Sequence, residues 1–173
     1  MTQELRKFEI RKATEADFSA IIDLVNRSFH EVDSSYVKED PETDTTVRQD
    51  GPFFVALDNN QVIGCVMVNL NLRGIIKLAV EKSYRNQGLG CRLMTEAESY
   101  ARSQGWPVVY TAVASFHPEL LRYYKNLGYE EMGITDFVFG PDNPYYVIRL
   151  SKILTRILPP LTAPAETARQ RRL

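Results

Sequence analysis

Hydrophobic and polar positions along the chain form short segments of two periodicities. Seven short apolar or alternating runs predict strands, at Phe8–Arg11, Phe53–Leu57, Val62–Leu70, Ile75–Val80, Val108–Ala114, Tyr129–Phe139 and Tyr145–Leu150. Three amphipathic stretches predict helices, at about Glu15–Ser28, from Cys91 to Gly105, and from Pro118 to Gly128. Strands interleaved with helices in this order predict a three-layer α/β domain with a mixed sheet.

Capping and turn residues support several of these boundaries. Thr14, with Asp17 three places on, has the spacing of a helix N-cap. The sequence Asp58-Asn59-Asn60 predicts a hairpin turn between two of the strands. The run Gly140–Pro144 predicts the loop between the last two strands, and Pro41 is expected to open a short extra helix in the polar stretch from His30 to Asp50.

Length and composition predict one soluble domain. The chain has 173 residues, of which 44% are hydrophobic and 25% charged, as in ordinary globular proteins. We expect the domain to occupy residues 1–151. Residues 152–173 form a tail with an apolar start, expected to pack on the body or on a second subunit as in a homodimer, and a polar, basic end expected to be disordered.

Charge and hydropathy exclude some functions. A net charge of −1 argues against a general nucleic-acid binder. No apolar run reaches the roughly 18 residues that a membrane span needs, and the first residues lack a secretory signal, so we expect a cytoplasmic protein. Two isolated cysteines, Cys65 and Cys91, predict neither a disulfide framework nor a metal site, and both are expected to be packed side chains.

The strongest chemical signal is Arg85-Asn86-Gln87-Gly88-Leu89-Gly90, between a predicted strand and a predicted helix. In such a loop the glycines let the backbone approach an anion, and the first N–H groups of the helix point at it. A Rossmann loop would need a third glycine, and a P-loop would need Gly-Lys-Ser/Thr. The sequence contains neither, so both of these nucleotide-binding motifs are excluded.

The loop resembles the acetyl-CoA signature of the GNAT superfamily of N-acetyltransferases, Arg/Gln-x-x-Gly-x-Gly/Ala. The segment from Leu121 to Tyr129 is similar to that family's second motif, an aromatic-Tyr-x-x-x-Gly-aromatic helix end. The resemblance runs from about Phe8 to Ser151, and Pro118–Leu121 looks like a small, mostly uncharacterised single-domain branch. It implies a three-layer fold whose mostly antiparallel sheet has splayed fourth and fifth strands.

The resemblance also implies where acetyl-CoA, the expected co-substrate, binds. Its pyrophosphate is expected on Arg85 and on the loop backbone at Asn86, Gln87, Gly88, Leu89 and Gly90. The backbone of Leu78, Ala79 and Val80 is expected to hold the pantetheine arm, which would enter between the splayed strands.

Two side chains are candidates for proton transfer. Tyr124 aligns with the tyrosine that many family members use to protonate the leaving thiolate, and Tyr123 is its rival. The base is less defined, because the fourth strand carries no glutamate and Glu81, which follows it, is expected to point away. His117, near a position where the family often has an asparagine, is the candidate base, with His30 as an alternative. No metal is expected.

Acceptor binding is expected at the end of the first helix, the acidic stretch after it and the loop near Phe137–Tyr145. Seven acids against two bases between His30 and Asp50 favour a cationic amine, although a solvated acidic loop is an equally good interpretation. The leading hypothesis is acetyl transfer to the primary amine of a small molecule by direct attack in a ternary complex. The alternatives are a protein lysine or N-terminal acetyltransferase and a non-catalytic acetyl-CoA-binding regulator.

Overall fold

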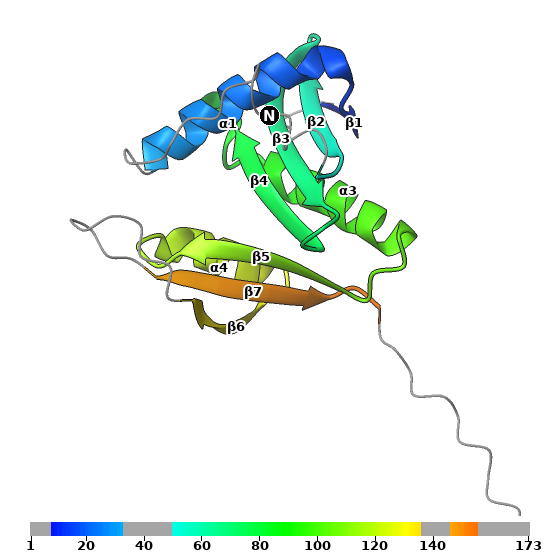
Figure 1. Ribbon diagram of the computed structural model, residues 1–173. Coiled ribbons are helices and arrows are strands. Elements are labelled where there is room, and N and C mark those ends of the chain that lie inside the picture. Colours follow the sequence, from blue (N-terminus) through cyan, green and yellow to red (C-terminus); the bar gives the residue numbers. More distant parts are fainter. Residues whose placement is uncertain (1–7, 33–49, 136–145, 156–173) are drawn as a thin grey trace, which may run out of the picture.

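A computed structural model describes residues 8–32, 50–135 and 146–155. Its strands are β1 (Glu9–Lys12), β2 (Phe53–Asp58), β3 (Gln61–Asn69), β4 (Gly74–Val80), β5 (Val108–Ala114), β6 (Glu130–Thr135) and β7 (Val147–Ile153). The helices are α1 (Phe18–Val32), α3 (Leu89–Ser103) and α4 (Pro118–Asn126), and the 3-10 helices are Glu15–Asp17 and Lys82–Tyr84. The predicted three-layer α/β fold is confirmed (Figure 1).

One seven-stranded sheet runs in the order β1-β2-β3-β4-β5-β7-β6. Every neighbouring pair is antiparallel except β4 and β5, which are parallel and share a single registered pair, Gly74 with Tyr110. Beyond that pair the two strands diverge, so the sheet consists of two halves joined at one end (Figure 1). The splayed strands are therefore where the resemblance implied them.

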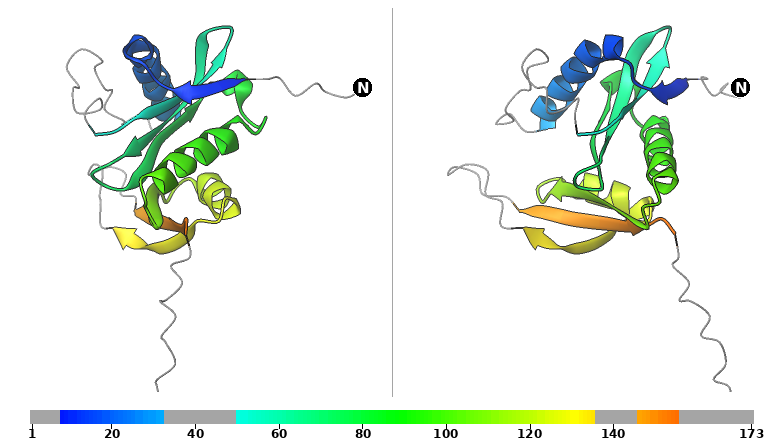
Figure 2. Two further views of the ribbon diagram at one scale, coloured as in Figure 1. Left: turned by 90° about the vertical axis from the view of Figure 1, so that its right-hand side faces the viewer. Right: turned by 45° about the vertical axis from the view of Figure 1, so that its right-hand side comes forward.

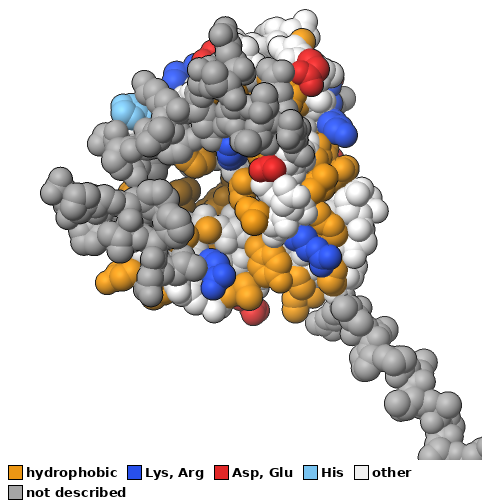
Figure 3. Space-filling view, in the orientation of Figure 1, with side chains coloured by type: hydrophobic (Ala, Val, Ile, Leu, Met, Phe, Trp, Pro, Cys, Tyr) orange, Lys and Arg blue, Asp and Glu red, His pale blue; other side chains and the backbone are white. Residues whose placement is uncertain are grey.

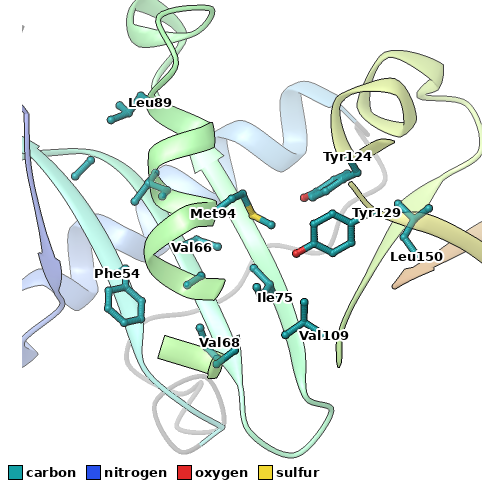
Figure 4. Packing of buried hydrophobic residues seen from close by; sticks show 14 of the residues in the cluster. Phe54, Val66, Val68, Ile75, Leu89, Met94, Val109, Tyr124, Tyr129 and Leu150 are labelled. Atoms are coloured by element: carbon teal, nitrogen blue, oxygen red, sulfur yellow. The ribbon is translucent and has the colours of Figure 1, made fainter. Parts of the chain in front are cut away.

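Helices cover both faces of the first half of the sheet, α1 on one side and α3 on the other (Figure 2). The apolar spacing of α1 buries Ile21, Ile22, Leu24 and Val25 against Phe53, Val55, Met67 and other residues of β2 to β4. The apolar side of α3 buries Leu89, Leu93, Met94, Ala97 and Ala101. α4 lies on the same face as α3 and packs over the second half, with Tyr124, Tyr129 and Leu150 in this core (Figure 4).

Several boundaries differ from the sequence expectation. α1 continues to Val32 rather than ending near Ser28, and α3 begins at Leu89, before Cys91. β7 continues through Ile153, two residues past the expected domain boundary. Cys65 is buried as expected, but Cys91 is exposed, so its assignment as a packed side chain was wrong. At helical spacing Cys91 lies on the side of α3 opposite the buried Leu89 and Leu93.

Other expectations fall on residues that the structure does not describe. These are the short helix at Pro41, the acids between Glu31 and Asp50, the loop at Gly140–Pro144 and the tail beyond Thr155. Among the described helices, none has the length and apolar character required to cross a membrane.

Candidate functional site

The glycine loop presents an uncapped helix end. Gly88 is the N-cap of α3 and has a left-handed backbone (φ +79°), and Asn86 is also left-handed (φ +60°). No side chain of the described residues caps the first turn of α3, so its N–H groups are available to a ligand. A Cβ built on Gly88 would meet no atom within 4 Å, which means that the space in front of this helix end is open. The geometry suits an anion.

β4 leads into this loop and is irregular at its centre. Lys77 has a left-handed backbone (φ +54°), and the register with β3 shifts between Cys65 and Met67, where two residues of β4 oppose one of β3. Such a bulge re-aims the backbone and increases the local twist. Among the described residues, β4 pairs with β5 only at Gly74, so from Ile75 to Val80 no strand partner lies on the side of β4 that faces β5, and there the Val80 carbonyl accepts from Nε of Arg85. Backbone donors and acceptors on such an edge can pair with an extended ligand that carries amide groups.

A cavity of about 650 Å³ joins this edge to the glycine loop. Its lining comes from four elements: the end of α1, the end of β4, the loop with the first turn of α3, and one side of α4. These residues are Ser28, Phe29, Leu78, Ala79, Val80, Arg85, Asn86, Gly88, Gly90, Cys91, Glu119, Leu120 and Tyr123. In the space-filling view the surface is hollowed between the upper and lower halves, with mostly hydrophobic side chains around the hollow (Figure 3).

Most of the residues expected at the cofactor lie along this cavity, and two of them do not. Gln87 is exposed and donates to the Ser83 carbonyl (2.9 Å), and Leu89 is buried in the core beneath α3. Their side chains therefore have structural roles, and only their backbone groups could contact the cofactor. Cys91 lines the cavity without having been expected there, because its side chain gives no sequence signal of its own.

Arg85 lies at the mouth of the cavity and is already engaged. Its Nε donates to the Val80 carbonyl (2.9 Å), which fixes the guanidinium beside the end of β4. One terminal nitrogen donates to the Glu31 carboxylate at the end of α1 (3.1 Å). One turn earlier on the same helix, Arg27 pairs with Glu81 (3.0 Å). Glu81 is thus occupied by α1 and by the amide of Lys82.

Three tyrosines stack edge to face along α4 and its C-terminal end. The Tyr123 and Tyr124 ring centroids are 5.2 Å apart, and those of Tyr124 and Tyr129 are 5.5 Å apart. Tyr123 lines the cavity, whereas Tyr124 is 8% exposed and its hydroxyl, like that of Tyr129, points toward Met94 and Ile75 (Figure 4). Burial raises the pKa of Tyr124 in spite of a hydrogen bond with Thr111, so the phenol stays protonated.

His117 occupies the N-cap position of α4 beside an acid. Its Nδ1 lies 2.8 Å from Oε1 of Glu119, and the ring packs 4.2 Å from that of Phe116. Its Nε2 is buried and has no hydrogen-bond partner among the described residues. Glu119 lines the cavity, and its pKa is lowered first by its own backbone N–H and then by His117. His117 was expected to be an isolated histidine, and the structure places Glu119 beside it.

A second cavity of about 440 Å³ lies on the exposed side of α1, lined by Asp23, Asn26, Arg27, His30 and Glu31. His30 therefore lines this second cavity and does not line the cavity at the glycine loop. Among the described residues, no group of three or more His, Cys, Asp and Glu side chains has the arrangement of a metal site.

A strand edge without a partner strand, an uncapped helix end and a joining cavity are what an α/β domain needs to bind an anionic, amide-bearing cofactor in a split sheet. Residues 18–129 match the model of the acetyltransferase (GNAT) family, so the chain belongs to that family. This makes the domain an N-acetyltransferase domain with acetyl-CoA as its co-substrate.

Two curated relatives agree with this assignment. The chain is 24% identical over 141 residues to an uncharacterised N-acetyltransferase of Methanocaldococcus jannaschii, covering 73% of this chain and 62% of the relative. It is 32% identical over 83 residues to one of Chlorobaculum tepidum, covering 46% and 50%. The chain thus matches between half and two thirds of the length of these relatives.

Solved structures share the fold. One is a protein of Salmonella typhimurium solved with acetyl-CoA, with a TM-score of 0.73 at 18% identity over 91% of this chain and 99% of that one. Another is the ribosomal-protein-S18-alanine N-acetyltransferase of Escherichia coli, with a TM-score of 0.72 at 16% identity over 86% and 95%.

Proposed function

We propose that this protein transfers the acetyl group of acetyl-CoA to the primary amine of a small molecule, by direct attack in a ternary complex. The observation that carries the proposal is one cavity that connects the uncapped end of α3 with the edge of β4 and the end of α1. Acetyl-CoA supplies a thioester, and the cavity would bring that thioester and an amine together. Fixing two reactants in this way supplies much of the rate enhancement of acyl transfer.

The proposed position of the cofactor follows from two sets of backbone groups, those at the start of α3 and those on the edge of β4. The N–H groups at Gly88 to Gly90 and the Arg85 guanidinium would hold the pyrophosphate. Leu78, Ala79 and Val80 would pair through their backbone with the amides of the pantetheine arm, as an added strand does. The arm would then run along β4 toward the bulge at Lys77, placing the thioester between the two halves of the sheet.

Tyr124 is the proposed acid for the departing thiolate. Its hydroxyl points from α4 across the split toward the β4 side (Figure 4). Its raised pKa keeps the hydroxyl protonated, so that it can donate the proton to the CoA thiolate as that thiolate leaves. Tyr123 is the alternative, because it lines the cavity directly. The two can be separated by single substitutions that remove only a hydroxyl.

Deprotonation of the amine is assigned to His117. Nδ1 of His117 lies 2.8 Å from Oε1 of Glu119, and Glu119 lines the cavity. A proton from the amine would pass through the Glu119 carboxylate to Nδ1, with the other proton of the ring on Nε2.

The acceptor is proposed to bind beside α1. Ser28 and Phe29 of this helix line the same cavity of about 650 Å³ that would hold the thioester, and Glu119 lines it from the side of α4. A carboxylate in this cavity favours a cationic amine.

The test is release of free thiol from acetyl-CoA over a panel of small amines, amino acids, aminoglycosides and peptides. Turnover of small amines at a kcat/KM well above that of peptides is the expected result. Preferential turnover of peptides would instead establish a protein acetyltransferase. Binding of acetyl-CoA without turnover of any amine would establish a non-catalytic regulator.

A further inference from the structure

We infer that Glu31 is a built-in competitor of the cofactor: its carboxylate holds the Arg85 guanidinium in the cofactor-free protein and must leave it when the pyrophosphate binds. The inference rests on the proposed seat of the pyrophosphate at Arg85. It goes further by assigning α1 a direct effect on cofactor affinity and on product release.

The contacts around Arg85 show how such an exchange would work. Nε is fixed on the Val80 carbonyl (2.9 Å), and a terminal nitrogen holds Glu31 (3.1 Å). The first contact keeps the guanidinium beside the end of β4, while the second occupies a donor that faces outward. A phosphate oxygen and a carboxylate oxygen use that donor in the same way. Only the Glu31 side chain therefore has to move.

The buried apolar side of α1 keeps the helix in place during the exchange, and a parallel ion pair lies beside the one at Arg85. Arg27 and Glu81 lie four residues before Glu31 and Arg85, respectively, and they pair at 3.0 Å. Neither belongs to the uncapped end of α3, so this contact can persist when Glu31 leaves Arg85. The helix stays docked, and the displaced carboxylate remains next to the loop.

The strength of the Arg85–Glu31 ion pair sets the expected effect on cofactor affinity. The Arg85 and Glu31 side chains are 36% and 44% exposed, so water screens their attraction. Exposed pairs of this kind change an equilibrium by about two- to fivefold. A competitor of this size lowers cofactor affinity slightly. It also lets Glu31 retake Arg85 as the product CoA departs, which speeds release.

The experiment measures the affinity of acetyl-CoA and of CoA for the full chain by titration calorimetry. Glu31→Gln should bind both ligands about two- to fivefold more tightly, with slower CoA dissociation in stopped-flow displacement. Asp23→Asn removes the same charge from the same helix without touching Arg85, and its affinity for acetyl-CoA should stay near that of the wild type.

A double-mutant cycle isolates the contact from long-range charge effects. In the Arg85→Gln background, Glu31→Gln should have no further effect on affinity, because the competition needs both groups. The inference would be overturned if Glu31→Gln raised the affinity for acetyl-CoA equally in both backgrounds. It would also be overturned if Asp23→Asn raised this affinity as much as Glu31→Gln does. Failure of the seat itself has a different signature, since Arg85→Gln alone would then bind acetyl-CoA like the wild type.

Discussion

At the scale of single residues, Gly88 makes the sharpest prediction about the cofactor. Its left-handed backbone disfavours a β-branched side chain, and an added Cβ would occupy the open space proposed for the pyrophosphate. Gly88→Val should lower acetyl-CoA affinity at least tenfold in calorimetry, because both the loop conformation and the space are lost.

Gly105 provides the matched control at the other end of α3. It is also left-handed (φ +74°), and its Cβ position is also open, but it does not line the cavity. Gly105→Val should lose a similar amount of stability, about 1–3 kcal/mol, while binding acetyl-CoA normally. If the two variants bound the cofactor equally well, the loop would not be the anion site.

Tyr124→Phe tests the proposed acid. The substitution keeps the stacked ring and removes only the hydroxyl, so kcat should fall by about 10²–10⁴-fold with little change in acetyl-CoA affinity. A thioester with a better leaving group should partly rescue this variant, because its thiolate needs less protonation.

Tyr123→Phe is the control for that experiment, since its hydroxyl lies beside Gly90 rather than across the split. A Cβ built on Gly90 would come within 2.9 Å of it. We expect Tyr123→Phe to keep most of the wild-type kcat. If Tyr123→Phe were the variant that lost turnover, the roles of the two tyrosines would be exchanged.

Sequence reasoning named the residues of the candidate site, but it could not describe the environment of each side chain. The glycine loop and the tyrosines could be read from motifs, because backbone freedom and helix spacing are local properties. The bulge at Lys77, the exposure of Cys91 and the pairing of His117 with Glu119 could not. Each of these depends on which residues face one another in the fold, and no single residue type specifies that.

At the scale of elements, the entry into α1 carries a testable charge network. The Asp17 carboxylate accepts hydrogen bonds from both terminal nitrogens of Arg11 (2.7 and 3.0 Å) and from the backbone N–H of Thr14 (2.7 Å). The hydrogen bond from Arg11 is the main cause that holds the pKa of Asp17 far below its usual range. Asp17→Asn keeps the size of the side chain and should lower the free energy of unfolding by about 1–3 kcal/mol at pH 7.

The sign of the pH dependence follows from that lowered pKa. The contribution of Asp17 is present above the pKa of the unfolded chain, about 3.9, and is lost as the pH falls through the lower pKa of the folded state. Urea unfolding at several pH values should therefore show a constant gap between wild type and Asp17→Asn near neutrality and a shrinking gap in acid. A gap independent of pH would show that the charge of Asp17 contributes nothing.

Most elements were predictable because their apolar periodicity is local, and the capping pair at Thr14 and Asp17 was found from spacing alone. Their order in the sheet was not predictable from periodicity. β7 lies between β5 and β6, which requires the chain to leave β5, form α4 and an outer strand, and return. The additional turn of α1 carries Phe29 into the cavity and Glu31 to Arg85, and the polar residues there gave no periodic signal.

At the scale of the whole molecule, the split sheet needs other contacts to hold its halves together. β4 and β5 share one registered pair, and a common core joins the halves further, with residues of α3 packed together with Tyr124, Tyr129 and Leu150. Glu98 of α3 is buried, and both of its oxygens accept from Nζ of Lys152 on β7 (2.8 Å each). Lys152 also lies 5.5 Å from the centre of the Tyr129 ring. This pair is a direct link between the two halves.

Lys152→Met should therefore destabilise the protein much more than removal of a surface ion pair. It keeps the length of the side chain but leaves the buried Glu98 carboxylate with Arg102 (3.3 Å) as its remaining ion-pair partner among the described residues. We expect a loss of about 2–4 kcal/mol in urea unfolding, at the lower end of what breaking a buried pair costs because Arg102 remains. Lys125→Met is the control, because Lys125 pairs with Glu131 at the surface (2.6 Å) and should contribute less than about 1 kcal/mol.

The double variant Glu98→Leu with Lys152→Met completes the argument about the link. If the cost of Lys152→Met comes from the stranded carboxylate, removing Glu98 as well should restore most of the stability. If the ion pair also sets the distance between the two halves, both Lys152→Met and the double variant should bind acetyl-CoA more weakly than the wild type. Stability would then recover in the double variant without affinity, because the apolar replacements pack but do not hold the halves at that distance. Recovery of both quantities would limit the pair to stability, and recovery of neither would mean that Lys152 acts through Tyr129.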